Sequence, residues 1–209
     1  MTEANNYPQV EFHFDFGSPN AYLAHRVIPD VEQRTGVKFA YIPVLIGGVF
    51  KATNNVSPMV ALKGVLNKSE YQQLETRRLL ARHGITDFRM NPHFPINTLQ
   101  LMRGAIVAQQ LGIGPAYIDA VFHAIWVDEK NMGDTEIVAE VLGNTSIPAE
   151  DILKGSADPD VKQRLISNTE ASVRRGNFGS PTFFVGDEMY FGKDRLGDVE
   201  DEIRKQLAF

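Results

Sequence analysis

The sequence predicts an α/β fold, a mixed four-stranded sheet flanked by helices, with a large all-helical insertion in the middle of the chain. Two observations indicate this class: strand patterns stand at both ends of the 209 residues, and the long middle carries almost only helical patterns. With 43% hydrophobic and 22% charged residues, the composition allows one sizeable core. We expect residues 1–50 and 177–209 to form one domain and residues 51–176 to form the insertion.

The N-terminal part predicts two strands joined by a helix. Residues 10–16 alternate between apolar and polar side chains, which is typical of a strand with one apolar face. Gly17 ends this strand, and residues 37–44 form a second one, which the usual right-handed crossover places parallel to the first. The apolar side chains of the first strand are Val10, Phe12, Phe14 and Phe16, and the polar ones are Glu11, His13 and Asp15.

The connecting helix begins at Ser18-Pro19, where a hydroxyl suited to an N-cap precedes a proline at the first helical position. Apolar residues then recur at helical spacing up to Gly36, which is a C-terminal stop signal. Pro29 lies inside this pattern and should kink or split the helix.

The middle of the chain predicts a series of helices with their own start and stop signals. Ser69 and Gln72 make a capping box for the second of them, which Gly84 ends. Trp126 is expected in the core of this block. The predicted helices start at Ser57-Pro58 and at Ser69, and then cover residues 98–111, 115–127, 134–142 and 158–176.

Strand patterns return near the C-terminus. Residues 182–185 and 188–191 flank Gly186-Asp187, a two-residue hairpin signal. Residues 194–207 predict a final helix, for which Asp194 is a candidate N-cap. The order β-α-β, helices, β-β-α is the thioredoxin arrangement with a helical insertion after its second strand.

Composition excludes several kinds of function. The chain has no cysteine, so disulfides, cysteine nucleophiles, thiolate zinc sites and Cys-x-x-Cys redox pairs are absent. A net charge of −5 offers no basic surface for nucleic acid, and no histidine pair has His-x-x-x-His spacing, so no metal is expected. Residues 1–10 show no secretory signal, and no stretch reaches the roughly 18 apolar residues of a membrane span. We therefore expect a cytoplasmic protein.

Four segments, taken together and in this order, resemble the 2-hydroxychromene-2-carboxylate isomerases, relatives of the kappa-class glutathione transferases and of thioredoxin-like disulfide oxidoreductases with a helical insertion. The resemblance extends from about residue 9 to 207. It implies glutathione as cofactor, a small aromatic substrate and, because relatives are commonly dimers, a homodimer. The segments are FDFGSPNAYLA (14–24), IGGVFKATNN (46–55), NPHFPINT (91–98) and FGSPTFFVGDEMYFGKDRL (178–196).

Ser18 is the predicted catalytic and cofactor-binding residue. By itself it reads as an N-cap, worth about 1 kcal/mol of helix stability; the resemblance implies that its hydroxyl bonds the sulfur of glutathione. A helix N-terminus stabilises a thiolate. A fall of about two pKa units would raise the thiolate fraction at pH 7 from about 3% to about 75%. Because nucleophilicity falls about eightfold at the same time, the net gain is only about threefold, and positioning must contribute more.

The C-terminal motif supplies the other cofactor-binding residues that the resemblance implies. Ser180-Pro181 reads as a turn before a strand, but in thioredoxin-like folds this proline is cis and the residue before it pairs with the glutathione backbone. Phe191, Gly192, Lys193, Asp194 and Arg195 are expected to hold the γ-glutamyl end, with a carboxylate for its ammonium and a cation for its carboxylate.

Substrate-binding residues are expected in two further segments. A lone lysine on a loop is usually only solvated, but the resemblance places Lys51 beside the substrate, where it would pair with the carboxylate and stabilise an enolate. Asn54 or Asn55 would hold glutathione or substrate. His93 is a weaker candidate, since a structural polar contact explains it as well, and Asn97 or Thr98 should cap the helix that follows.

The resemblance implies a glutathione-dependent isomerase that interconverts 2-hydroxychromene-2-carboxylate and trans-o-hydroxybenzylidenepyruvate, or a close aromatic analogue, by reversible thiolate addition. Two alternatives remain open. One is a kappa-like transferase or peroxidase, and the other is a non-catalytic binding module on a thioredoxin-like scaffold.

Overall fold

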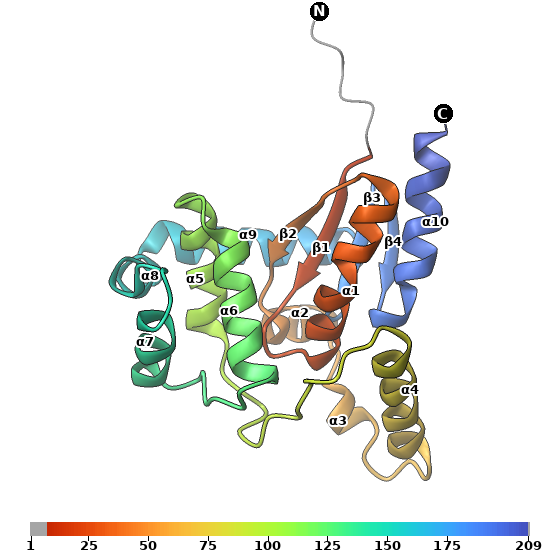
Figure 1. The fold of residues 1–209 in the computed structure, drawn as a ribbon, viewed down its shortest axis with the longest axis horizontal. Helices are drawn as coiled ribbons and strands as arrows, with labels where there is room; N and C mark the ends of the chain where they lie inside the picture. Colours follow the sequence, from red (N-terminus) through yellow and green to blue (C-terminus); the bar gives the residue numbers. More distant parts are fainter. Residues whose placement is uncertain (1–7, 209) are drawn as a thin grey trace, which may run out of the picture.

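A computed structural model describes residues 8–208. Most of the N-terminal segment in which we found no secretory signal, residues 1–7, lies outside the described residues. Its centre is a four-stranded sheet in the order β2-β1-β3-β4 (Figure 1). β1 and β2 are parallel, and β3 pairs antiparallel with both β1 and β4, so the predicted mixed sheet is confirmed. The strands are β1 (Val10–Phe14), β2 (Phe39–Pro43), β3 (Thr182–Val185) and β4 (Glu188–Phe191).

Helices cover both faces of the sheet and extend beyond one edge (Figure 1). α1 and α10 lie on one face, α9 crosses the other, and α5 to α8 form a block beside β2. The helices are α1 (Pro19–Thr35), α2 (Ile46–Thr53), α3 (Pro58–Ala61), α4 (Lys68–Arg82), α5 (Leu99–Gln110), α6 (Gly114–Trp126), α7 (Thr135–Gly143), α8 (Ala149–Ser156), α9 (Pro159–Arg174), the 3₁₀ turn η1 (Lys193–Arg195) and α10 (Leu196–Leu207). No helix within residues 8–208 is long and apolar enough to cross a membrane.

Two helices were not predicted, and one of them carries a predicted site residue. α8 follows Pro148 in a segment without a strong start signal. α2 begins at Ile46, shortly after the end of β2 at Pro43, so Lys51 lies in the last turn of a helix and not on a loop.

α1 runs unbroken through Pro29, so this proline does not split the helix, and the predicted kink stays a prediction. Two local predictions about helix starts were wrong. α4 begins at Lys68, which places Ser69 inside the helix, and no side chain caps its start, so the capping box does not form. Asp194 does not cap α10, because a 3₁₀ turn precedes that helix and no side chain caps it.

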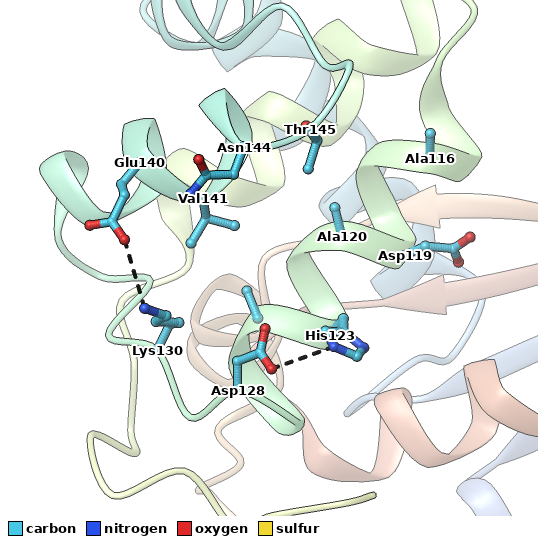
Figure 2. A pocket seen from close by; sticks show the side chains of 11 residues that line it. Ala116, Asp119, Ala120, His123, Asp128, Lys130, Glu140, Val141, Asn144 and Thr145 are labelled. Atoms are coloured by element: carbon cyan, nitrogen blue, oxygen red, sulfur yellow. Dashed lines mark ion pairs between the residues drawn. The ribbon is translucent and has the colours of Figure 1, made fainter.

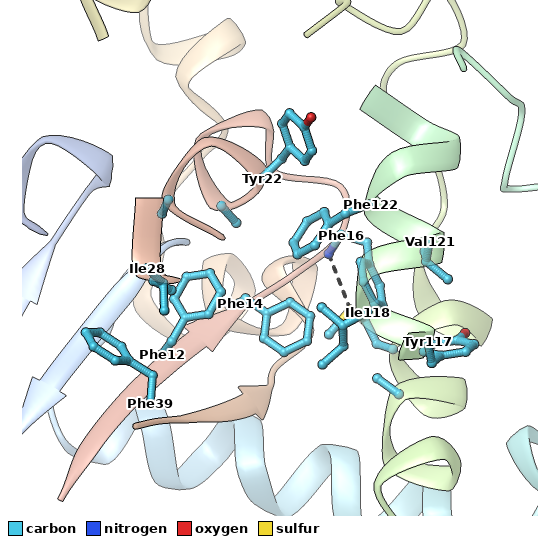
Figure 3. Packing of buried hydrophobic residues seen from close by; sticks show 14 of the residues in the cluster. Phe12, Phe14, Phe16, Tyr22, Ile28, Phe39, Tyr117, Ile118, Val121 and Phe122 are labelled. Atoms are coloured by element: carbon cyan, nitrogen blue, oxygen red, sulfur yellow. Dashed lines mark hydrogen bonds between the residues drawn. The ribbon is translucent and has the colours of Figure 1, made fainter. Parts of the chain in front are cut away.

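The first strand is buried on both sides. Its phenylalanines pack with α1 and α6 in an aromatic cluster that includes Tyr22 and Phe122 (Figure 3). The expectation of a single apolar face was incomplete, since His13 and Asp15 are also buried, at 3% and 0% exposed. Trp126 is fully buried as predicted, and its indole N–H donates to the carbonyl of Phe16 at 2.9 Å.

Candidate active site

The Ser18 corner, where β1 passes into α1, is built as an N-terminal helix cap. Ser18 has extended backbone angles, and its Oγ accepts from the N–H of Ala21 at 3.2 Å, so the predicted cap is confirmed. The same hydroxyl donates to the carbonyl of Ser180 at 2.9 Å. Ser18 is only 5% exposed. Its hydroxyl therefore stands at the positive end of α1 and faces the loop before β3.

That loop contains the Ser180-Pro181 peptide bond, which is cis, as predicted. The Ser180 hydroxyl accepts from the N–H of Asp15 at 3.1 Å, which ties the loop to the end of β1. On the other side, the N–H of Gly192 donates to the carbonyl of Pro181 at 3.0 Å. The structure thus brings Ser18, Ser180, Pro181 and the turn beginning at Gly192 together at one edge of the sheet.

Phe191 packs against Phe178, with the ring centroids 4.4 Å apart, and both residues are about two-fifths exposed. A Cβ added to Gly179 would lie 2.7 Å from the Phe191 ring, so a side chain at this position would displace it. The pair forms an apolar surface beside the cis-proline loop.

The end of α2 reaches the same loop. The amide nitrogen of Asn55 donates to the carbonyl of Phe178 at 2.8 Å. Asn54 ends the helix in the left-handed conformation, with φ of 54°. Lys51 is exposed one turn before Asn55, and its ammonium makes no ion pair within residues 8–208. The structure therefore places Asn55 at the loop, with Lys51 exposed one turn earlier in α2.

The η1 turn carries a closely paired lysine and aspartate. The Lys193 side chain is only 7% exposed, and its Nζ lies 2.7 Å from both carboxylate oxygens of Asp194, which is itself 61% exposed. Arg195 pairs with Asp198 at 3.1 Å. α4 adds Glu75 nearby, whose pKa is lowered mainly by its hydrogen bond to Arg78, with a smaller contribution from the Lys193 charge.

The side chain of His93 makes no hydrogen bond or ion pair with the other predicted residues within residues 8–208. It is exposed, and only its N–H is engaged, by the side chain of Asn91 at 2.8 Å. The loop that carries it does approach the Ser18 corner, because a Cβ on Gly17 would lie 3.2 Å from Thr98. Of the two predicted caps of α5, Asn97 is the one that accepts a helix N–H, from Leu99.

Asp15 is the residue at this site that the sequence did not single out. Its carboxylate accepts three hydrogen bonds, from the N–H groups of Gly17 and Ile46, both at 2.8 Å, and from the Thr98 hydroxyl at 2.7 Å. Complete burial raises the pKa of Asp15, although these three bonds oppose the shift. The only available signal was its position at the end of a strand, directly before the Gly17-Ser18 turn.

A separate open hollow of about 570 Å³ lies between α6 and α7 (Figure 2). Polar and ionisable side chains such as His123, Asp128 and Lys130 line it, and none of the predicted site residues does. Within the described part of the chain, no group of three or more histidine, aspartate or glutamate residues could hold a metal ion.

A thioredoxin-like sheet, a cis-proline loop and a serine at the start of the first helix define a thioredoxin-like protein without a cysteine thiol of its own. Comparison with known proteins agrees with this class, because residues 9–204 match the model of the DSBA-like thioredoxin domain. The chain is 30% identical to a 2-hydroxychromene-2-carboxylate isomerase of Pseudomonas sp. (strain C18) over 93% of this chain and 89% of the relative.

A solved structure of a 2-hydroxychromene-2-carboxylate isomerase matches with a TM-score of 0.80 and 26% identity, over 94% of both chains. Human glutathione S-transferase kappa 1 is 26% identical, over 90% of this chain and 87% of the relative. The chain belongs to the family of 2-hydroxychromene-2-carboxylate isomerases, within the DSBA-like thioredoxin domains. Its relatives include both isomerases and glutathione transferases, which supports an enzyme.

Proposed function

We propose that this chain is a glutathione-dependent isomerase that interconverts 2-hydroxychromene-2-carboxylate and trans-o-hydroxybenzylidenepyruvate, or a close aromatic analogue. The observation that carries the proposal is the Ser18 hydroxyl at the start of α1, facing the cis-proline loop in a chain without cysteine. The names of its relatives support the isomerase reaction. A homodimer in the cytoplasm remains a prediction that belongs to this proposal.

The residues around the Ser18 corner suit a tripeptide thiol. The Ser18 hydroxyl and the N-terminus of α1 suit a thiolate. The Lys193–Asp194 pair offers a cation and a carboxylate side by side, as a γ-glutamyl group with its own ammonium and carboxylate requires. Because Gly192 is hydrogen-bonded to Pro181, this pair is held next to the loop that Ser18 faces.

When bound, glutathione supplies a thiol whose reversible addition to a conjugated carbon turns the neighbouring double bond into a single bond that can rotate. The contribution of the chain begins with Ser18. Its hydroxyl turns from the Ser180 carbonyl to donate to sulfur, which frees that carbonyl to accept an N–H from the tripeptide. The free N–H groups and partial positive charge at the start of α1 lower the pKa of the thiol, and this also makes sulfur a better leaving group.

Lys51 is assigned to the substrate. Its ammonium is exposed on the turn of α2 that precedes Asn55, and Asn55 is anchored to Phe178. An ammonium at this place pairs with the substrate carboxylate and stabilises the negative charge that develops on the pyruvyl oxygen. The half-exposed rings of Phe178 and Phe191 offer an apolar surface to the aromatic part of the substrate.

Turnover of the chromene by purified protein, with and without glutathione, tests the proposal directly. We expect no turnover above background without glutathione; equal rates would refute it. Ser18→Ala should lower kcat on the order of tenfold or more while glutathione still binds, since the backbone contacts remain. Ser156→Ala is the matched control, because Ser156 is also buried and donates to a carbonyl, that of Leu153 at 2.7 Å, but in α8.

A transferase is the second candidate, supported by the 26% identity to human glutathione S-transferase kappa 1. A transferase would bind glutathione at the same Ser18 corner but would release a conjugate in which the glutathione sulfur stays bonded to the electrophile. Conjugation of chlorodinitrobenzene at a higher kcat/KM than isomerisation would favour this function.

A further inference from the structure

Asp15 is the most completely hydrogen-bonded side chain at the Ser18 corner, and the mechanism above does not use it. It is 0% exposed, and no cation pairs with it within residues 8–208. Its two carboxylate oxygens divide their partners: Oδ1 accepts from Gly17 and Thr98, whereas Oδ2 accepts from the N–H of Ile46 alone. A buried carboxylate without a cation is costly, so this arrangement needs a reason.

The partner of Oδ2 is the first residue of α2. The N-cap residue of this helix, Leu45, has no side chain that can accept a hydrogen bond, so Asp15 provides the missing cap from β1. A carboxylate is also favoured at a helix N-terminus by the helix dipole. α2 is the helix that carries Lys51 and ends at Asn54.

The main chain of Asp15 reaches the other two parts of the corner. Its carbonyl accepts from the N–H of Ser18 at 3.0 Å, and its N–H donates to the hydroxyl of Ser180 at 3.1 Å. One residue therefore joins the serine, the cis-proline loop and the start of the lysine-bearing helix.

We propose that Asp15 is a positioning residue whose carboxylate holds the start of α2 against the Ser18 corner and thereby sets the position of Lys51 relative to bound sulfur. This inference rests on the proposed function. Misplacement of a reacting partner by about 1 Å can cost on the order of a hundredfold in rate, so an indirect residue of this kind has a measurable effect.

Asp15→Asn is the first test. An amide keeps the size of the side chain but replaces one acceptor oxygen with a donor nitrogen. With this nitrogen in the place of Oδ2, the N–H of Ile46 loses its acceptor, whereas Gly17 and Thr98 keep theirs. We expect kcat to fall about tenfold or more with the glutathione Kd, measured by calorimetry, changed less than about threefold. Thr98→Val is the matched control, because it removes a donor from the same carboxylate without touching α2.

Coupling to Lys51 separates positioning from a merely structural role. In a Lys51→Met background, Asp15→Asn should change kcat by less than about twofold, because the residue on which it acts is gone. Equal effects in both backgrounds would overturn the proposal.

Hydrogen exchange distinguishes failure of this inference from failure of the proposed function. Asp15→Asn should speed exchange of the amides in residues 46–53, and Thr98→Val should not, whatever the protein catalyses. Unchanged exchange in Asp15→Asn would overturn the inference. If exchange is faster but the wild-type protein does not isomerise the chromene, the inference that Asp15 anchors α2 stands, and only the proposed reaction is rejected.

Discussion

His13 in β1 and Asp15 just after the end of this strand are two residues apart, and both are buried, yet they have different kinds of partner. His13 is in the middle of the strand and bonds to side chains: Nε2 lies 2.7 Å from Glu11, and Nδ1 lies 2.7 Å from the hydroxyl of Ser172 in α9. Asp15 is at the strand end and binds two main-chain N–H groups and one hydroxyl.

The His13 network also continues toward the cis-proline loop, but only through further side chains. The amide of Asn177 donates to the hydroxyl of Ser172 at 2.7 Å. The Asn177 oxygen accepts from the N–H of Gly179 and from the hydroxyl of Thr182, both at 2.8 Å. Side chains can rotate to new partners, whereas main-chain donors cannot move without moving their segment. His13 therefore joins the sheet to α9, whereas Asp15 holds the start of α2 in place.

The largest expected effect is that of Asp15→Ala. It leaves three donors without an acceptor in a place that water does not reach, and each orphan costs about 1–3 kcal/mol. We expect the free energy of unfolding, measured in urea, to fall by about 4 kcal/mol. A loss below about 1 kcal/mol would show that the donors find other partners and that the two residues differ less than we infer.

His13→Ala should have a smaller effect on stability, about 2–3 kcal/mol, because the freed groups are side chains that can turn. Its effect on catalysis should differ in kind: kcat and the glutathione Kd should stay within about twofold of wild type. Steady-state kinetics and calorimetry on the same preparation measure both. A tenfold fall in kcat would place His13 in the site and remove the contrast with Asp15.

The pH dependence of stability should have opposite signs at the two residues. Burial raises the pKa of Asp15 above its ordinary value of 3.8. As the pH rises, the carboxyl group of Asp15 therefore loses its proton in the unfolded chain before it does so in the folded protein, and the free energy of unfolding falls as the pH rises from 3.8. Burial lowers the pKa of His13 below its ordinary 6.5, despite the opposing effect of Glu11, whose own charge is shared with Arg175. The stability from neutral His13 is therefore present above pH 6.5 and is lost as the pH falls below it.

Urea unfolding at several pH values measures this difference. The destabilisation caused by Asp15→Asn should shrink as the pH rises from 4, and that caused by His13→Gln should shrink as the pH falls from 8. Curves of the same sign would contradict the assignment.

Thr98→Val should show the smallest effect. It removes one of two donors to Oδ1 and keeps the shape of the side chain, so we expect a loss of about 1 kcal/mol in unfolding free energy. Gly17 still serves that oxygen, and α2 keeps its anchor. If Thr98→Val lowers the free energy of unfolding as much as Asp15→Ala does, Asp15 acts mainly by holding the start of α5 and not the start of α2.

Local patterns in the sequence determined the sheet and the Ser18 corner. Alternation in residues 10–16, the Gly186-Asp187 turn and the Ser18-Pro19 start each depend on neighbours in the chain, and each is present in the structure. The order of these elements, with the family resemblance, was enough to predict the four-stranded sheet and a cis proline at residue 181.

Only the tertiary structure decided what covers the polar side of β1 and where the charges of the site pair. Alternation separates two faces of a strand, but it does not say whether a helix more than a hundred residues away, here α9, will exclude water from the second face. The sequence predicts Asp194 as a helix cap, but in the structure its carboxylate forms an ion pair with Lys193. The alternation in β1 suggests that Asp15 lies on the polar side of the strand. In the structure its carboxylate is buried by groups at the starts of α2 and α5, which come together only in the folded chain.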